Sequence, residues 1–161
     1  MATITEVEIT EFSFTARNLG VSSDKLRAIY NMGYKPNSSL ELTKFAIVIR
    51  SDDGAQGEYV MHWGGSRSTM AQTPALAPSL LGRDPDHREL IWNEMKRELR
   101  QHDGMGIGPI DIALWDLAGK RFGASVSALL GGYRSRLKAY ASTYHGDRNG
   151  GRHGAGRGER P

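Results

Sequence analysis

The stretch GPIDIALWDLAGKRFG, from Gly108 to Gly123, carries the strongest structural signal in this 161-residue sequence. Its apolar residues recur at intervals of three and four, which is the period of an amphipathic helix. They form one stripe, which comprises Ile107, Ile110, Leu114 and Leu117 and is widened by Trp115, Ala118 and Phe122. Pro109 suits a first helical turn, and Gly123 suits a left-handed C-cap. We therefore predict a helix over residues 108–122.

Two more helical segments are predicted before this one, over residues 68–81 and 85–100. The second has apolar residues at four-residue spacing, namely Ile91, Met95 and Leu99. Asp84-Pro85 is predicted to start it, because an acidic N-cap followed by proline is a common helix beginning. The first contains Pro74 and Pro78, which predict a break or a kink because proline lacks the backbone N–H.

Upstream of the helices the pattern is that of strands. Residues 42–50 are apolar at nearly every position from Phe45 to Ile49, which predicts a central strand covered on both faces. A turn at residues 51–54 then leads into a partner strand over 56–63. With a first strand over 3–14, we predict a three-stranded antiparallel meander. A sheet followed by helices is an α+β order, so the fold class is α+β with a helical subdomain after the meander.

A long segment, from Thr15 to Leu40, separates the first two predicted strands. Segments of this length within a compact domain are usually lids, binding loops or disordered stretches. Tyr30 and Tyr34 would give such a lid amphipathic contact groups. Both the lid and the disordered interpretation stay open at this point.

The C-terminal part changes composition. Residues 137–144 are predicted to form a strand that has no remaining partner in the sequence. The following 17 residues, 145–161, include six glycines and no aliphatic residue larger than alanine, so disorder is expected. One interpretation is an arginine–glycine tail that binds RNA. Out-of-frame translation of a GC-rich gene is favoured, because the tail lacks aromatic residues for base stacking and interrupts a strand.

Several motifs together resemble the end of the capping domain in the mandelate racemase and muconate-lactonizing group of the enolase superfamily. They are Asp111–Lys120, Gly123, Leu129-Leu130-Gly131-Gly132 with Arg136, and the Gly82-Arg83-Asp84-Pro85 turn. The resemblance covers about residues 3–147. It implies an enolase N-terminal-like cap at residues 1–132 and the first strand of an absent (β/α) barrel at 133–145. Residues 146–161 would then be a disordered tail that is out of frame.

The resemblance also implies a chemistry for the parent enzyme, an isomerase or lyase. Its barrel would hold Mg²⁺ on carboxylates, and a base would remove the proton α to a substrate carboxylate. A barrel needs at least about 200 residues, and the family's Lys-x-Lys base motif has no counterpart here. After Lys120 the only lysine is Lys138, and after Gly132 the only acids are Asp147 and Glu159. We therefore assign no catalytic residue and no metal ligand, and expect no catalysis from this chain alone.

In similar enzymes two regions of the cap touch the substrate. One is the long segment after the first strand, with Tyr30 and Tyr34. The other follows the third strand, with His62 and Trp63 beside two glycines. An equally weighted alternative is that Trp63 packs at an interface or core edge and that His62 is an ordinary surface histidine. His145 would lie at the end of the first barrel strand, on the face that carries active sites in barrels. The resemblance makes these five residues the candidate contacts to a small carboxylate substrate.

The remaining composition limits other functions. No N-terminal basic start or apolar run indicates a secretory signal, and no run is long enough to span a bilayer, so a cytoplasmic protein without a membrane partner is expected. Most of the positive charge excess lies in the tail, which argues against a nucleic-acid-binding face on the fold. A homo-oligomer is expected from the resemblance. Two alternatives stay open, a stand-alone binding or oligomerisation module and an RNA-associated domain.

Overall fold

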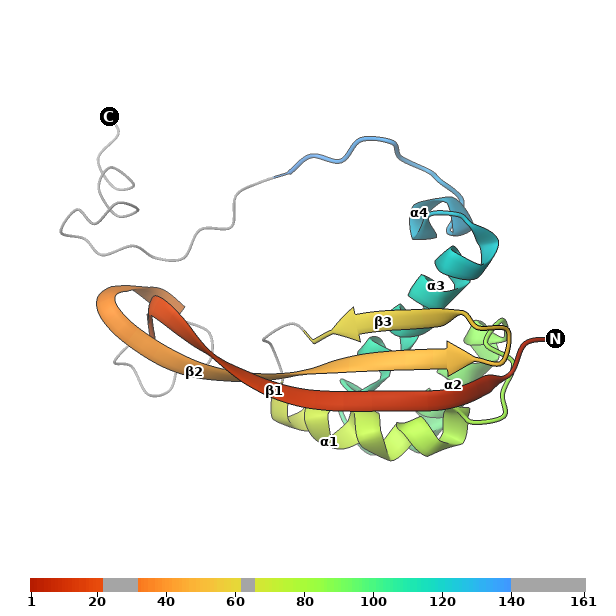
Figure 1. Cartoon of the computed structure of the whole chain (residues 1–161), viewed down its shortest axis with the longest axis horizontal. Coiled ribbons are helices and arrows are strands. Elements are labelled where there is room, and N and C mark those ends of the chain that lie inside the picture. The colour runs from red at the N-terminus through yellow and green to blue at the C-terminus, as the bar shows by residue number, and fades with distance from the viewer. Residues whose placement is uncertain (22–31, 62–65, 140–161) are drawn as a thin grey trace. The chain divides into compact units, whose positions relative to one another are not determined.

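The computed structural model describes residues 1–21, 32–61 and 66–139, with the backbone alone at 19–21, 32–36 and 66 (Figure 1). Three strands come first and helices follow, so the α+β prediction is confirmed. The elements are β1 (Ile4–Val21), β2 (Met32–Ser51), β3 (Gln56–Val60), α1 (Ser66–Leu76), η1 (Ala77–Leu80), α2 (Arg88–Glu98), α3 (Ile107–Phe122) and α4 (Val126–Leu129).

The chain divides into two compact units. The first comprises Met1–Phe12 and Lys44–Ser135, and the second comprises Ser13–Thr43 and Arg136–Pro161. Strands β1 and β2 contribute residues to both. The described helices and the hydrophobic core belong to the first unit.

The strands form a three-stranded sheet in the order β1-β2-β3 (Figure 1). Strands β2 and β3 pair antiparallel, with Ala46 opposite Val60 and Arg50 opposite Gln56. Strands β1 and β2 also run antiparallel. In the first unit the Thr5 hydroxyl donates to the Arg50 carbonyl at 3.3 Å, and in the second the hydroxyls of Ser13 and Thr43 lie 2.9 Å apart. The predicted meander with a central second strand is confirmed.

Strands β1 and β2 are longer than predicted. The prediction of one loop from Thr15 to Leu40 is wrong, because β1 continues to Val21 and β2 begins at Met32. Polar cross-strand contacts replace the apolar alternation in this part of the hairpin. The Thr15 hydroxyl donates to Glu41, and the Asn37 N–H donates to the side chain of Asn18 at 3.0 Å. Residues 22–31 lie outside the described residues.

Strand β2 buries only one of its faces. Phe45, Ile47 and Ile49 are at most 1% exposed, whereas Ala46 and Val48 between them are half-buried. The prediction that both faces are covered is therefore wrong. The odd-numbered residues enter the core cluster with α1, α2 and α3. On the other face Arg50 pairs with Glu6 at 3.2 Å and Glu8 at 2.9 Å, so a charged network covers it instead of apolar packing.

The predicted helices are present, with one wrong beginning. Helix α2 starts at Arg88, and Asp84-Pro85 belongs to a turn before it, in which the Asp86 N–H donates to the Asp84 carboxylate at 2.9 Å. The acid therefore closes the turn and does not cap the helix. Helix α1 contains Pro74 and passes into the 3₁₀ turn η1 at Pro78, so the predicted break is confirmed.

Helix α3 and the aliphatic stripes of α2 and α3 are as predicted. Phe122 was predicted to widen the stripe of α3, and this is wrong: it is the last residue of the helix, lies outside the core cluster and is 54% exposed. Gly123 ends α3 with φ of 60°, the left-handed C-cap. The stripe residues of α2 and α3 are all less than 9% exposed, namely Ile91, Met95, Leu99, Ile107, Ile110, Leu114 and Leu117. None of the described helices has the length and apolar composition to cross a membrane.

The predicted strand at residues 137–144 is not formed in its described part. Residues 137–139 have no strand pairing, and Leu137 is 78% exposed. A strand needs a neighbouring backbone to pair with, and local sequence preference alone does not supply one. The rest of this segment and the whole of the 146–161 tail lie outside the described residues.

Candidate functional site

The structure does not describe the side chains of the five predicted contact residues. Tyr30, His62, Trp63 and His145 lie outside the described residues. Tyr34 lies in β2, where only the backbone is described. These five residues stay predictions. The described part of the chain shows how α3 is held against β3 and the neighbouring turns, and it shows a pocket that the sequence did not indicate.

Helix α3 lies directly against β3. Gly57 of β3 meets the backbone of Ala113 and the side chain of Leu117, an approach that leaves no room for a β-carbon. The next residue, Glu58, donates its N–H to the Asp116 carboxylate at 2.8 Å. Since β3 is an edge strand, this carboxylate satisfies a backbone donor that would otherwise be unpaired.

Lys120 reinforces the contact between α3 and β3. Its ammonium lies 2.7 Å from Asp116 and 3.6 Å from Glu58. The hydrogen bond to Asp116, and then the two negative charges, raise the pKa of Lys120. The lysine therefore keeps its charge and helps to neutralise the two acids beside the strand edge.

Arg121, at the end of α3, connects two turns to the helix. Its Nε lies 2.7 Å from Asp53 in the β2–β3 turn, and a terminal nitrogen lies 2.8 Å from Asp86 in the turn before α2. The side chain of Arg121 is only 15% exposed. Because one guanidinium serves two carboxylates from separate turns, it fixes both turns against α3.

The Asp53 carboxylate is the most perturbed acid in this network. The hydrogen bond from the Ser51 hydroxyl lowers its pKa most, followed by the Ala55 N–H and then Arg121, and together they bring the pKa to about 2. The ordinary value is 3.8. Asp53 therefore stays ionised well below the pH at which an isolated aspartate takes up a proton.

This lowered pKa predicts an acid-dependent loss of stability. The folded pKa lies below the unfolded one, so the stabilisation by Asp53 is complete above about pH 4 and is lost as pH falls toward about 2. Urea unfolding between pH 5 and pH 2.5 should show the midpoint decreasing. The Asp53→Asn variant should lose part of this pH dependence, because asparagine does not titrate over that range. An unchanged slope in the variant would contradict the assignment.

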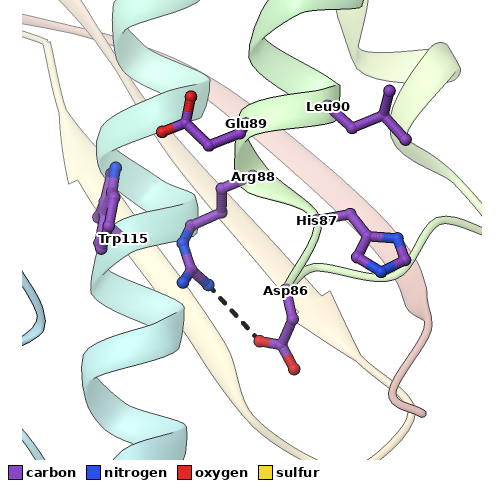
Figure 2. Close-up of a pocket in the computed structure, with 6 residues that line it drawn as sticks. All are labelled: Asp86, His87, Arg88, Glu89, Leu90 and Trp115. Atoms are coloured by element: carbon purple, nitrogen blue, oxygen red, sulfur yellow. Dashed lines mark hydrogen bonds and ion pairs between the residues drawn. The ribbon is translucent and has the colours of Figure 1, made fainter.

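A pocket lies where α2 begins and faces α3 (Figure 2). Its volume is about 390 Å³, and it is lined by Asp86, His87, Arg88, Glu89, Leu90 and Trp115. We refer to it as the Trp115 pocket. The Arg88 guanidinium lies over the Trp115 ring, 4.5 Å from its centroid, which is a cation–π distance. Figure 2 shows the Arg88 side chain extending between Trp115 and Asp86.

Arg88 is incompletely satisfied by hydrogen bonds. One terminal nitrogen lies 3.5 Å from Asp86, a long hydrogen bond, while Asp86 binds Arg121 at 2.8 Å. Its Nε is buried without a hydrogen-bond partner in the described residues. The ring of Trp115 therefore provides much of the environment of this cation.

Asp111 lies one turn before Trp115 on α3. It is half-buried, and burial, followed by the negative charge of Glu89, raises its pKa, while Arg88 opposes the shift. Around the Trp115 pocket there are thus carboxylates, a guanidinium and an indole. Its lining has no serine, threonine or cysteine to act as a nucleophile. The chemistry of this lining suits contact with a charged or aromatic group.

The described residues do not fit a magnesium site. Magnesium is held by oxygen ligands, usually carboxylates. Within residues 1–21, 32–61 and 66–139, no three acidic or histidine side chains lie in a group that could hold a metal ion. Asp53 and Asp86, which share one guanidinium, are both bound to Arg121. We derive no metal-dependent step from these side chains.

Sequence reasoning did not single out the Trp115 pocket. It assigned Trp115 only to the apolar stripe of the helix and used Asp84-Pro85 only as a helix start. The available signal was the i,i+4 spacing of Asp111 and Trp115, which places both on one flank of the helix beside the Leu114 stripe. Asp111, an acidic residue among apolar ones, indicates that this flank of the helix is not buried in the core.

Comparison with known families gives the class. A family model described as the N-terminal domain of mandelate racemase / muconate lactonizing enzyme matches residues 38–131. This range includes most of β2, all of β3 and the helices through α4. The chain therefore belongs to the mandelate racemase / muconate lactonizing enzyme family, as its resemblance predicted.

The relatives are enzymes of sugar-acid metabolism by name. The chain is 39% identical over 106 residues to a D-galactarolactone cycloisomerase of Agrobacterium fabrum, which covers 60% of this chain and 27% of the relative. It is 36% identical over 110 residues to an L-talarate/galactarate dehydratase of Salmonella typhimurium, covering 62% and 27%. The chain thus spans about a quarter of the length of the curated relatives it matches.

Solved structures of the superfamily share the fold. The chain matches a D-glucarate dehydratase from Agrobacterium tumefaciens complexed with magnesium, with a TM-score of 0.66 and 26% identity over 91% of this chain and 37% of that one. An L-talarate dehydratase from Polaromonas sp. JS666, complexed with Mg and L-glucarate, matches with a TM-score of 0.65 and 25% identity, covering 86% and 37%. The cap-like α+β fold predicted from the sequence is confirmed.

Proposed function

We propose that this chain is the substrate-capping domain of a magnesium-dependent enzyme that removes the α-proton of a sugar-acid-like carboxylate. The match of residues 38–131 to the family's N-terminal domain carries the proposal. The substrate class follows from the names of the relatives, which are cycloisomerases and dehydratases of sugar acids. By itself the chain is not catalytic, because the base and the metal ligands would belong to a barrel outside it.

The proposed contacts to the substrate are Tyr30, Tyr34, His62, Trp63 and His145. A cap over a barrel mouth excludes water, which strengthens electrostatic interactions in the site beneath it. Aromatic rings and imidazoles suit this role, since they present apolar area together with a hydrogen-bonding tip.

The described structure supports the role of residues 62–65 as a positioned contact segment. Met61, which precedes it, is 2% exposed, and its N–H donates to the Phe45 carbonyl at 2.9 Å. Helix α1 begins at Ser66, directly after the segment. The segment is therefore flanked by a buried residue and by a helix of the first unit, which holds the hydrophobic core, and a supporting scaffold is what a site on a loop requires.

Exposed apolar side chains near the end of the first unit suit contact with another domain. Phe122, Leu130 and Tyr133 are 54%, 64% and 88% exposed, and they follow one another through the end of α3 and past α4. We propose that a barrel, beginning at residues 133–145, covers this surface. Residues 146–161 would be an out-of-frame replacement for the continuing barrel sequence. Reading the nucleotide sequence after codon 145 in the other frames tests this directly.

The activity test compares the 161-residue chain with a version that continues into a barrel. The chain alone should give no saturable heat with millimolar Mg²⁺ and no exchange of a substrate α-proton with solvent deuterium. The barrel-bearing version should bind the metal and exchange the α-proton of at least one sugar acid. Turnover by the chain alone would contradict the proposal. Suppose that neither the 161-residue chain nor the barrel-bearing version is active, and that the chain forms a stable dimer through Phe122, Leu130 and Tyr133. This result would favour the alternative, a stand-alone oligomerisation module.

A further inference from the structure

We propose that a second pocket, between the C-terminal half of α2 and the turn that leads into α3, binds a small organic anion with an apolar body. The pocket has a volume of about 320 Å³. The residues that matter for its chemistry are Trp92, Lys96, Leu99, Arg100, His102 and Ile107. We refer to it as the Trp92 pocket. It lies entirely within the first unit and shares no lining residue with the Trp115 pocket.

The helix geometry brings a ring and two cations together. Trp92, Lys96 and Arg100 are spaced four residues apart, so they follow one another along one face of α2 and its C-terminal continuation. The neighbouring face is fixed in the core through Ile91 and Met95, which are 1% and 2% exposed. The three side chains therefore project from a rotationally fixed helix.

The two cations are available to a ligand. In the described residues, neither Lys96 nor Arg100 has a carboxylate within ion-pair distance. Arg100 makes one hydrogen bond, to the carbonyl of Arg97 at 3.2 Å. By contrast, Arg50 and Arg121 are each bound to two carboxylates. An anion in the Trp92 pocket would thus meet two cations that form no ion pair in the described residues.

The acid in the wall of this pocket is already engaged. The Asp103 carboxylate accepts from the Gln72 side chain at 2.7 Å and from the Met105 N–H at 3.1 Å. Both donors hold the same oxygen of this carboxylate in the turn before α3. Asp103 is therefore committed to shaping the turn, and it does not pair with Lys96 or Arg100.

The floor of the pocket is apolar. Leu99 and Ile107 are 8% and 4% exposed, and the half-buried Trp92 ring completes this surface. An apolar floor with cations at the rim suits an aromatic or aliphatic carboxylate or phosphate, which buries its body and presents its charge to Lys96 and Arg100. A polyhydroxylated acid would leave hydroxyl groups unpaired on this floor. The inference does not depend on the proposed capping function.

Titration of the ¹⁵N-labelled 161-residue chain with phenyl phosphate and with benzoate tests the proposal. Saturable shifts of the Trp92 indole N–H and of the backbone of residues 96–107 are expected. Inorganic phosphate alone and benzyl alcohol alone should bind at least tenfold more weakly, since the first lacks the apolar body and the second lacks the negative charge. The stronger of the two organic anions identifies whether the head group is a phosphate or a carboxylate.

Substitution of cations inside and outside the pocket distinguishes binding in the Trp92 pocket from a general attraction of anions to a positively charged protein. The double variant Lys96→Gln/Arg100→Gln should weaken binding at least tenfold, because it removes two charge-assisted contacts. Arg67→Gln/Arg134→Gln, which removes two exposed cations elsewhere, should leave binding unchanged. Lys96→Arg/Arg100→Lys should retain it, and this variant guards against a loss caused by misfolding. Linear shifts without saturation, or an equal loss in both glutamine variants, would overturn the proposal.

Discussion

Replacing Gly57 by alanine should destabilise the folded chain by about 3 kcal/mol or more, the upper end of the range for overpacking a core. The new β-carbon would overlap the carbonyl oxygen of Ala113 and lie 2.6 Å from both the Cβ and the backbone nitrogen of Leu117. Backbone atoms cannot rotate away as a flexible side chain can. Helix α3 would have to move away from β3, which would also stretch the bond between Asp116 and the Glu58 N–H.

The matched control is Gly108→Ala in α3, the helix that Gly57 of β3 contacts. A β-carbon at Gly108 meets no atom within 4 Å, and alanine is the better helix former. This variant should be between unchanged and about 1 kcal/mol more stable. Urea unfolding followed by circular dichroism measures both. If the Gly57 variant retained the stability of the parent chain, the close approach of α3 and β3 would be wrong.

The helices were the most predictable part of the fold, because their signal is local. The spacing of Ile110, Leu114 and Leu117 specifies one buried face whatever lies opposite it. The beginning of α2 was less predictable. Asp84-Pro85 suits both a helix N-cap and a preceding turn, and the hydrogen bond from the Asp86 N–H to Asp84 shows that the turn is adopted.

The sheet was predicted in its order but not in its extent. Thr15, Asn18, Asn37 and Glu41 are polar residues that local preference places in a loop. In the structure they lie on strands, where Thr15 contacts Glu41 and Asn18 contacts Asn37 across the hairpin. Such pairing depends on residues about 20 positions apart or more, and a single sequence does not show it. The same limit applies to Gly57, whose contact with Ala113 joins segments far apart in the chain.

The Trp115 pocket could not be assembled from local patterns. Arg88 stacks on a ring 27 positions later in the sequence, and Asp86 reaches Arg121 from a different turn. The motifs of the family could be identified in the sequence because they are contiguous, and they gave the class correctly. The five proposed contact residues came from the same resemblance, and they require a functional measurement.

His62→Ala in the barrel-bearing protein should lower kcat/KM for its sugar acid by about 10- to 100-fold, the effect of losing one hydrogen bond to a charged group. The segment that carries His62 is only four residues long, between the buried Met61 and the start of α1. If His62 only holds the substrate, it binds ground state and transition state alike, so KM should rise while kcat changes little.

The matched control for this substitution is His87→Ala. The His87 side chain is 61% exposed, lines the Trp115 pocket and is not among the proposed contacts. Its removal should leave both kcat and KM unchanged. A fall in kcat with KM constant in the His62 variant would assign the residue to the reaction step, which the capping proposal does not allow. Equal kinetics in the parent and the His62 variant would remove His62 from the contact set, since a residue that touches the substrate cannot be lost without an effect on kcat/KM.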